Sequence, residues 1–353
     1  MKGMKFGLFC SFQSVEQPPR FEEVYRAIFE QLAAAEELGF DSVLLSEHHF
    51  MENGYCPSLL PVAAAIGART QRLKLITLLL LPLHHPVRVA EDAAVVDVIS
   101  GGRLVLGLGL GYRDVEFRGF GIPKNERGRR MDEGIAIVRG CWTDDSFSFE
   151  GRHFQLDGIN VQPKPVQRPR PPIWVGAQSK PALLRAAGTD GHIYGTAPLP
   201  FLVKQQHILH DALSERGKNA AEFETTLIRE CFVGESDEQA WEEAGEYFLE
   251  MYRRDYLSWD QVVEADEGGK ARYATQQDDP MFERERFSRD RAIIGSPDYC
   301  IAEIRRYREQ LDFDNLILRM HMPGLPLDKV MRSMQLFARE VLPHFAEDPG
   351  VAR

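Results

Sequence analysis

The feature that most constrains the fold is a regular alternation of short apolar runs with helical stripes along most of the chain. The third run, LKLITLLLL, is apolar on both faces, which is typical of a parallel strand covered on both sides. A helical pattern follows each run, and eight strand–helix units in one chain predict a closed (β/α)8 TIM barrel. The eight runs span residues 5–10, 41–46, 73–81, 104–109, 173–176, 191–195, 225–233 and 315–320.

A doubly wound open sheet with a small second domain is the alternative fold. Gly107, Gly109 and Gly111 form GxGxG rather than the GxGxxG of dinucleotide-binding sheets, and no acid follows about 20 residues later at a strand end. The chain has 353 residues, and closed barrels often exceed about 250 residues as one domain. We therefore expect a single barrel domain over residues 1–353.

Two segments interrupt the alternation. Residues 147–172 read as a hairpin insertion followed by a stiff connector, because the stretch PKPVQRPRPP cannot lie inside a helix. Between Leu257 and Ile293 there is no Leu or Ile, and charges of both signs are dense. We expect residues 258–292 to be disordered or to form a long mobile loop that acts as a lid.

Composition excludes several functional classes. A net charge of −11 argues against nucleic-acid binding, which needs a basic face. The five cysteines are far apart and odd in number, which indicates a reducing compartment without disulfides or structural zinc. No targeting segment and no membrane-spanning run is present, so we expect a cytoplasmic protein. The lack of HExxH and HxH patterns argues further against a metal site.

Glu47, His48 and His49 directly follow the second strand, where the strand ends of a barrel line the active site. Because adjacent residues at a strand end point in opposite directions, one histidine should face the pocket while the other packs or bonds locally. His84 and His85 follow the third strand. They are either connector residues at the pocket rim or supply a second histidine to the site, and the sequence leaves both interpretations open.

Two further loops suit a flat, anionic ligand. Alternate glycines in residues 107–121, Gly111 among them, would let the backbone approach such a ligand closely. Arg113 and Arg118 would meet a phosphate, or would pair with Asp114 or Glu116 at the surface. Residues 176–179 (GAQS) precede a helix, so Ser179 is either part of an anion site or a plain N-cap.

These segments, in this order, resemble the bacterial luciferase-like, flavin-dependent monooxygenases. The resemblance covers nearly the whole chain, and EHHF together with HPVR..ED carries its specificity. The matching segments are MKFGLF (4–9), LGFDSVLLSEHHF (38–50), LPLHHPVRVAEDAAVVDVISGGRL (81–104), EGRHFQLDG (150–158), PPIWVGAQS (171–179) and GSPDYCIAEI (295–304).

The resemblance implies a barrel that binds reduced FMN (FMNH2), supplied by a separate NAD(P)H:flavin reductase. Molecular oxygen adds at the flavin C4a atom, and the resulting peroxide oxygenates a small organic substrate. His48 carries over as the catalytic base, with Glu47 orienting it or contacting the flavin. The family also implies a homodimer that forms through the helices at 59–69 and 87–99.

The resemblance places the flavin-binding residues as well. It implies a non-proline cis peptide at Thr77–Leu78 beneath the flavin ring and a phosphate pocket at Gln178 and Ser179. Gly176 and Ala177 are the cofactor-binding residues expected just before that pocket. The arginine that grips the phosphate in luciferases falls on Leu110, and Arg113 is the substitute that we expect.

Such departures argue against light emission and for a generic oxygenase or oxidoreductase. A deazaflavin-dependent oxidoreductase, which transfers hydride without oxygen, is one alternative. A non-catalytic flavin-binding protein is another, although storage needs no base such as His48 at the ring. The sequence does not name the substrate.

Overall fold

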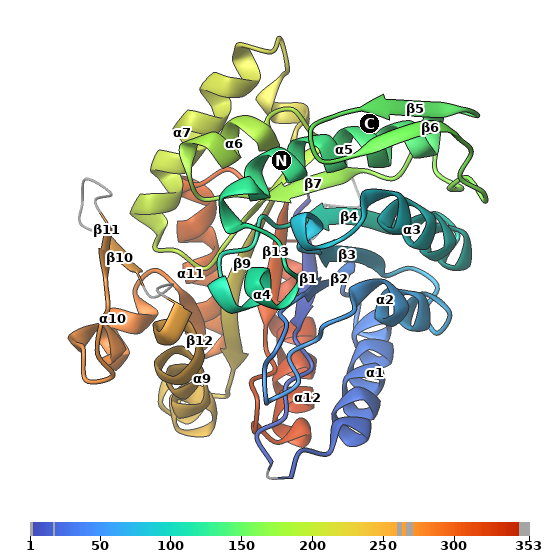
Figure 1. The fold of residues 1–353 in the computed structure, drawn as a ribbon. Helices are drawn as coiled ribbons and strands as arrows, with labels where there is room; N and C mark the ends of the chain where they lie inside the picture. The colour runs from blue at the N-terminus through green and yellow to red at the C-terminus, as the bar shows by residue number, and fades with distance from the viewer. Residues whose placement is uncertain (1–2, 17, 260–262, 266–270, 346–353) are drawn as a thin grey trace.

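The computed structural model describes residues 3–16, 18–259, 263–265 and 271–345. In this part of the chain, eight parallel strands close a barrel in the order β9-β13-β1-β2-β3-β4-β7-β8, and β8 pairs back with β9 (Figure 1). The predicted TIM barrel is therefore confirmed, with its eight strands where the apolar runs lie. They are β1 (Lys5–Cys10), β2 (Ser42–Ser46), β3 (Lys74–Leu78), β4 (Leu104–Leu108), β7 (Ile173–Gly176), β8 (Gly191–Tyr194), β9 (Glu224–Val233) and β13 (Asn315–Arg319).

One buried side chain from each barrel strand fills the interior of the barrel. Their mutual packing explains why the strands are apolar on both faces, since the opposite face of each strand packs against the outer helices. This interior layer excludes solvent from the barrel and supports the residues at the carboxyl ends of the strands. Its members are Phe9, Leu44, Ile76, Val105, Trp174, Ile193, Ile228 and Ile317.

Helices follow each barrel strand and cover the outside of the barrel (Figure 1). In the first of them, apolar residues at helical spacing are buried at Ile28, Leu32 and Ala35. Ser296 begins another as its N-cap and accepts a hydrogen bond from the Tyr299 N–H. The helices are α1 (Phe21–Glu37), α2 (Leu59–Gly67), α3 (Pro86–Ser100), α4 (Asp114–Gly119), α5 (Arg127–Thr143), α6 (Lys180–Ala186), α7 (Leu199–Ser214), α8 (Asp237–Ala240), α9 (Glu246–Met251), α10 (Arg284–Ser288), α11 (Pro297–Gln310) and α12 (Leu327–Leu336).

The predicted hairpin insertion is present. Strands β5 (Phe147–Glu150) and β6 (Gln155–Ile159) pair antiparallel outside the barrel (Figure 1). The proline-rich connector that follows is fixed to α3, because the buried Asp97 carboxylate accepts hydrogen bonds from the backbone N–H groups of Val166 and Gln167. The connector thus leads the chain back to β7.

Residues 258–292 were expected to be disordered or to form a long mobile loop that acts as a lid. The described residues of this segment form regular elements, and the role as a lid stays a prediction. Strands β10 (Val263–Ala265) and β11 (Ala271–Tyr273) form a small hairpin, and α10 follows. Met281, Phe282 and Phe287 are buried in the main core, so apolar anchors other than Leu and Ile hold the segment. Residues 260–262 and 266–270 lie outside the described residues.

The predicted cis peptide at Thr77–Leu78 is wrong. The cis bonds among the described residues are Gln162–Pro163 and Arg168–Pro169. The backbone beyond Leu78 instead continues alongside β4, since the Leu79 N–H donates to the Gly107 carbonyl at 3.0 Å and the Gly109 N–H donates to the Leu79 carbonyl at 2.7 Å. Among the described residues, no helix combines the length and the apolar character needed to cross a membrane.

Candidate active site

A cavity of about 320 Å³ opens at the carboxyl ends of the barrel strands. Phe9, Ile193 and Ile228 of the interior layer form part of its lining. Two groups of residues form much of its lining. One, which we call the glycine end, consists of Gly109, Leu110, Gly111, Arg127, Gly176, Ala177, Gln178 and Ser179. The other, which we call the aromatic end, consists of His48, Tyr55, Tyr112, Tyr256 and Arg319.

His48 lines the cavity and is held between two partners. Its Nδ1 lies 2.8 Å from Glu116 Oε1, and its Nε2 lies 3.1 Å from the Tyr112 hydroxyl. A carboxylate can only accept, so Nδ1 carries the proton in neutral His48 and Nε2 offers a lone pair to the Tyr112 hydroxyl. The chain Glu116–His48–Tyr112 therefore places a base at the cavity wall.

Glu116 lies on α4 and is fully buried. Burial alone would raise the pKa of this carboxyl group. The hydrogen bond and charge of His48, the His49 backbone N–H and the Arg113 guanidinium together lower the pKa below its ordinary value. Glu116 is thus ionised at neutral pH and stabilises a protonated His48. For Tyr112, burial raises the pKa well above its ordinary value, so the hydroxyl keeps its proton.

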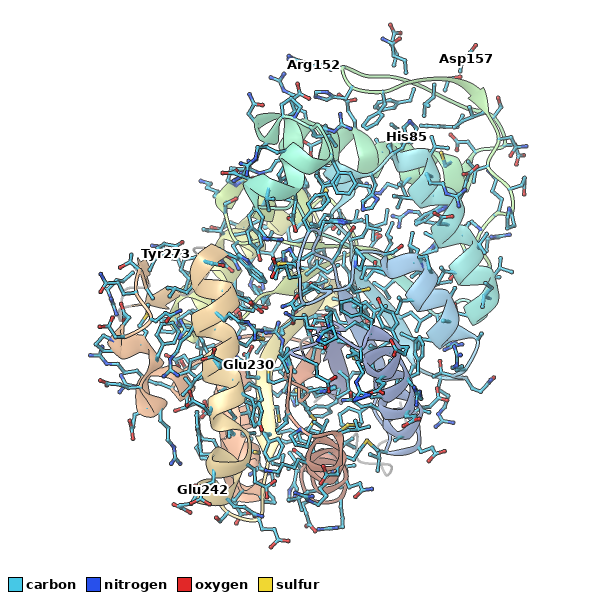
Figure 2. The ribbon with its side chains drawn as sticks, turned by 60° about the horizontal axis from the view of Figure 1, so that its bottom comes forward. His85, Arg152, Asp157, Glu230, Glu242 and Tyr273 are labelled. Atoms are coloured by element: carbon cyan, nitrogen blue, oxygen red, sulfur yellow. The ribbon has the colours of Figure 1, made fainter. Side chains whose placement is uncertain are left out.

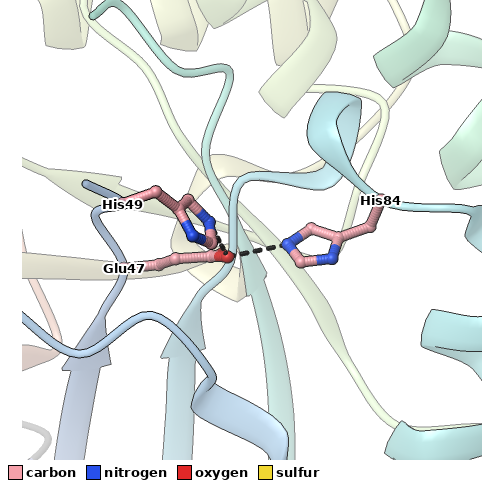
Figure 3. Close-up of side chains that lie close together, drawn as sticks. All are labelled: Glu47, His49 and His84. Atoms are coloured by element: carbon pink, nitrogen blue, oxygen red, sulfur yellow. Dashed lines mark hydrogen bonds and ion pairs between the residues drawn. The ribbon is translucent and has the colours of Figure 1, made fainter. Parts of the chain in front are cut away.

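Glu47, at the same strand end, joins a separate cluster (Figure 3). Its Oε1 accepts hydrogen bonds from Nε2 of His49 at 2.6 Å and Nε2 of His84 at 2.7 Å, while Oε2 accepts one from the Leu80 N–H at 2.6 Å. Burial would raise the pKa of Glu47, but the two histidine hydrogen bonds lower it to about 2. The ionised carboxylate thereby ties the loops after β2 and β3 together.

This cluster combines the ligand types that zinc and iron prefer, and its three ligand atoms lie within 4.8 Å of one another. The N–O distances of 2.6 and 2.7 Å are those of direct hydrogen bonds, which satisfy both imidazoles and the carboxylate. A metal ion would have to displace both bonds. The absence of a metal centre therefore stays a prediction.

Glu47 does not orient His48, which was one of the two roles expected for it. Successive residues at the end of β2 point in opposite directions, so Glu47 and His48 enter different clusters. The expectation that one histidine faces the pocket while the other bonds locally is confirmed, with His48 and His49 in these roles. Glu47 itself lies in the cavity lining, beside His48.

The two interpretations left open for His84 and His85 apply to different residues. His84 reaches the site through its bond to Glu47. His85 is exposed, is not among the described lining residues, and packs edge-on against Phe154 with ring centroids 5.4 Å apart. Figure 2 shows it near the β5–β6 hairpin.

Aromatic rings surround His48. The ring centroids of Tyr55 and Trp259 each lie 4.8 Å from that of His48, and Tyr112 lies at 5.4 Å. Trp259 comes from the segment predicted to be a lid, and the Arg113 guanidinium stacks on it at 5.3 Å. The described start of that segment thus covers His48 with an apolar ring.

The structure places some of the expected flavin-binding residues in the lining of the cavity and others elsewhere. Leu78, Gly111 and residues 176–179 line the cavity. Thr77 instead points at β4, where its hydroxyl donates to the Gly107 carbonyl at 3.1 Å. Arg113 lies at the aromatic end, where it donates to Glu116 and to the His49 carbonyl. The Ser179 side chain makes no capping hydrogen bond, which leaves its hydroxyl available to a ligand.

Arg127 occupies the position beside the glycine end that Arg113 was expected to fill. It lines the cavity, and its buried Nε has no hydrogen-bond partner among the described residues. A buried guanidinium N–H without a partner fits an anion that the protein itself does not supply. With Gln178 and Ser179, it provides a donor set that suits a phosphate group.

Residues 4–312 match the family described as luciferase-like monooxygenases. The chain belongs to the luciferase-like monooxygenase family. The motif-based prediction of the family is confirmed.

Several relatives extend over most of the chain. The oxygenase component of the flavin-dependent trigonelline monooxygenase of Acinetobacter baylyi is 25% identical over 98% of this chain and 96% of its own. An F420-dependent glucose-6-phosphate dehydrogenase of Nakamurella multipartita is 29% identical over 92% of this chain and 97% of its own. The crystal structure of monooxygenase RslO1 from Streptomyces bottropensis superposes with a TM-score of 0.84 at 28% identity, covering 97% of this chain and 100% of that one. The chain spans only 62% and 64% of the length of two uncharacterized Sinorhizobium fredii relatives.

Sequence reasoning missed four residues of this luciferase-like site: Tyr112, Glu116, Arg127 and Arg319. A surface pair between Glu116 and an arginine was one of the two alternatives left open for Arg113 and Arg118. The pair with Arg113 exists at 3.1 Å, but Glu116 is buried. The signal for its burial lies in helix α4, where Glu116 and Phe117 share the inner face while Val115 and Arg118 are exposed.

Proposed function

We propose that this protein is a monooxygenase that uses reduced FMN and molecular oxygen to oxygenate a small organic substrate. The observation that carries the proposal is the chain Glu116–His48–Tyr112, which places an oriented base in the wall of the cavity. A flavin-binding protein without activity would have no use for such a buried, charged arrangement. The family membership of the chain supports the same reaction class.

The glycine end of the cavity suits FMN. Arg127, Gln178 and Ser179 would hold the phosphate, and the backbone at Gly109 and Gly111 would let the flat ring approach closely. Reduced FMN, when bound, supplies the electrons and the activation of oxygen. Leu78 and Leu80 would provide an apolar surface for the ring.

In this proposal His48 takes a proton from the substrate or returns one. His48 and Tyr112 both line the cavity, and His48 Nε2 lies beside the Tyr112 hydroxyl, so proton transfer and substrate orientation would occur at one place. Glu116 stabilises the imidazolium that forms when the proton is taken. Trp259 would keep water away from His48 during the reaction, because water diverts activated oxygen from the substrate.

The proposal is tested by anaerobic titration of the protein with FMNH2 and, separately, with reduced coenzyme F420. We expect FMNH2 to bind at micromolar concentration, and oxygen then to enter a bound substrate. Binding of F420 alone, with hydride transfer in the absence of oxygen, would instead establish the deazaflavin alternative. The F420-dependent relative from Nakamurella supports keeping that alternative.

Replacing Arg127 by alanine is expected to weaken FMN binding about 10- to 100-fold, because a charged hydrogen bond to phosphate is lost. Riboflavin, which has no phosphate, should bind the variant and the original protein equally. Arg129→Ala, an exposed arginine on the same helix, is the matched control. Equal weakening of FMN and riboflavin would show that Arg127 supports the fold and not the phosphate.

A separate reductase and a second copy of the chain are the proposed protein partners. The name of the Acinetobacter relative, an oxygenase component, supports a reductase that delivers FMNH2. The five cysteines are all free and buried, which supports a reducing compartment such as the cytoplasm.

A separate prediction concerns the proposed homodimer. Helix α3 exposes Val95, Val98 and Ile99 by 42%, 44% and 46%, an apolar stripe on one of the two helices expected at the interface. Val98→Asp should therefore shift the protein from dimer to monomer in sedimentation velocity runs over a range of concentrations. Val15→Asp, at an equally exposed valine in the loop after β1, should leave the dimer intact. A Val98→Asp protein that stays dimeric would rule out this face.

A further inference from the structure

The aromatic end of the cavity contains a buried cation that the proposed oxygen chemistry does not use. Arg319, the last residue of β13, lines the cavity and is only 3% exposed. Its guanidinium carbon lies 4.0 Å from the centre of the Phe9 ring and 5.4 Å from that of Tyr256. These two rings fix the orientation of the guanidinium plane.

The hydrogen bonds of Arg319 involve Nη1 and Nη2 but not Nε. Nη1 donates to Glu230 Oε1 at 3.1 Å and to Met251 Sδ at 3.8 Å, and Nη2 donates to the Tyr256 hydroxyl at 2.8 Å. Nε is buried and has no hydrogen-bond partner among the described residues. Tyr256 accepts from Arg319, so its own hydroxyl proton remains to be donated. Because buried donors are nearly always paired, these two groups indicate an acceptor that a ligand brings.

The surrounding charges favour the same kind of ligand. Glu230 is fully buried, and the Tyr252 hydroxyl donates to the same Oε1 atom at 2.8 Å. The carboxylate in the cavity wall, Glu47, has both oxygens occupied by His49, His84 and Leu80. The aromatic end therefore presents donors from Arg319 and Tyr256, while Glu47 has no free oxygen. Glu230 Oε2 has no hydrogen-bond partner among the described residues, but Glu230 does not belong to the described lining.

The shape of the aromatic end comes from flat side chains. Tyr55, Tyr112 and Tyr256 line it, and Trp259 packs against all three with ring centroids between 5.0 and 6.4 Å apart. Aromatic faces and edges pack best against another planar ring. A ligand ring held here would lie next to His48, which touches three of these four side chains.

We propose that the aromatic end is a substrate subsite for a planar aromatic molecule bearing an acceptor oxygen, such as an aryl carboxylate or a phenolate. Arg319 Nε and the Tyr256 hydroxyl bind the oxygen, and the surrounding rings place the aromatic ring beside His48. The proposal rests on the proposed function, since it names the substrate class of that same cavity.

The subsite is tested by isothermal titration calorimetry with benzoate as the probe, in the absence of flavin. Cyclohexanecarboxylate, which has the same charge but no planar ring, is the ligand control. We expect benzoate to bind and cyclohexanecarboxylate to bind at least about tenfold more weakly. Equal affinities for the two acids would overturn the aromatic part of the proposal.

Three variants test whether Arg319 and the Tyr256 hydroxyl bind the oxygen of the ligand. The double variant Arg319→Met/Glu230→Gln removes the buried pair without leaving a lone charge, and should weaken benzoate binding about 10- to 100-fold. Glu230→Gln alone, the matched control, keeps Arg319 and removes its counter-charge, so benzoate should bind as tightly as before or more tightly. Tyr256→Phe keeps the ring and removes the second donor, and should weaken binding severalfold.

Unchanged benzoate affinity in the double variant would overturn the proposal. If that variant fails to fold, as circular dichroism would show, Tyr256→Phe decides, because it leaves the buried ion pair and the ring in place. Neither measurement involves flavin or oxygen. A lost subsite is thus distinguishable from a failure of FMNH2 to bind, which would remove the proposed function itself.

Discussion

His48→Ala is expected to lower the rate of substrate oxygenation about 10²- to 10⁴-fold, the usual contribution of a positioned general base. FMNH2 should still bind, because the residues proposed to hold its phosphate lie at the glycine end of the cavity. Single-turnover experiments with pre-reduced flavin would measure the loss, together with the hydrogen peroxide released when oxygen is not transferred.

His85→Ala is the matched control for this experiment. His85 follows the neighbouring strand, but it is exposed and contacts Phe154 rather than the cavity. Its loss should leave oxygenation within about twofold of the original rate, as for a surface substitution away from the site. Oxygenation that survives in His48→Ala at the rate of this control would refute the role of His48.

Glu116→Gln refines the same prediction. The ionised carboxylate of Glu116 stabilises a positive charge on His48, and a neutral amide does not. The same single-turnover experiments should therefore show slower oxygenation in this variant, because the imidazolium that forms on His48 loses its counter-charge. A rate equal to that of the His85→Ala control would contradict this role of Glu116.

Gly107→Ala is expected to cost more than about 4 kcal/mol of folding free energy, or to prevent folding. A β-carbon at this position of β4 would lie 1.8 Å from the Thr77 carbonyl oxygen and 3.2 Å from the Ile193 side chain. The clash is with backbone of the adjacent barrel strand, which cannot move without breaking the ladder between β3 and β4. Urea denaturation followed by circular dichroism would measure the loss.

Gly128→Ala provides the comparison for Gly107. This glycine lies in α5, and the nearest atom to its added β-carbon is 3.6 Å away, an ordinary contact. Alanine in a helix is favoured over glycine, so stability should rise by about 0.5–1 kcal/mol. A Gly107→Ala protein as stable as Gly128→Ala would mean that β3 and β4 do not approach each other this closely.

The glycine motif also shows how one pattern can serve two purposes. Alternate glycines in residues 107–111 were interpreted as a surface for a flat ligand. Gly109 and Gly111 do line the cavity, but Gly107 is required by the close approach of β3 and β4. Spacing along the chain does not distinguish these causes, since only the distance to the neighbouring strand separates them.

Chain periodicity predicted the barrel correctly because it reports local structure. A strand buried on both faces and a helix buried on one leave repeats that are visible within about ten residues, and the order of these repeats restricts the possible folds. Gly39, at a positive φ of 90°, ends the first helix as the sequence indicates. The short strand β12 (Ala292–Gly295) was missed, because it adds to the sheet without belonging to the eightfold repeat.

The sequence by itself determined the fold, the family and the position of His48 at a strand end, since each of these depends on neighbouring residues. Only the tertiary structure decided which side chains bind to His48 and to Arg319. Glu116 lies 68 residues from His48, and Arg319 reaches Glu230 across 89 residues. Whether a charged side chain is exposed, paired or left with a free donor in a cavity depends on distances between separate elements. A local sequence pattern contains no information on those distances. The positions of Arg113 beside Glu116 and of Arg127 at the glycine end therefore followed only from tertiary packing.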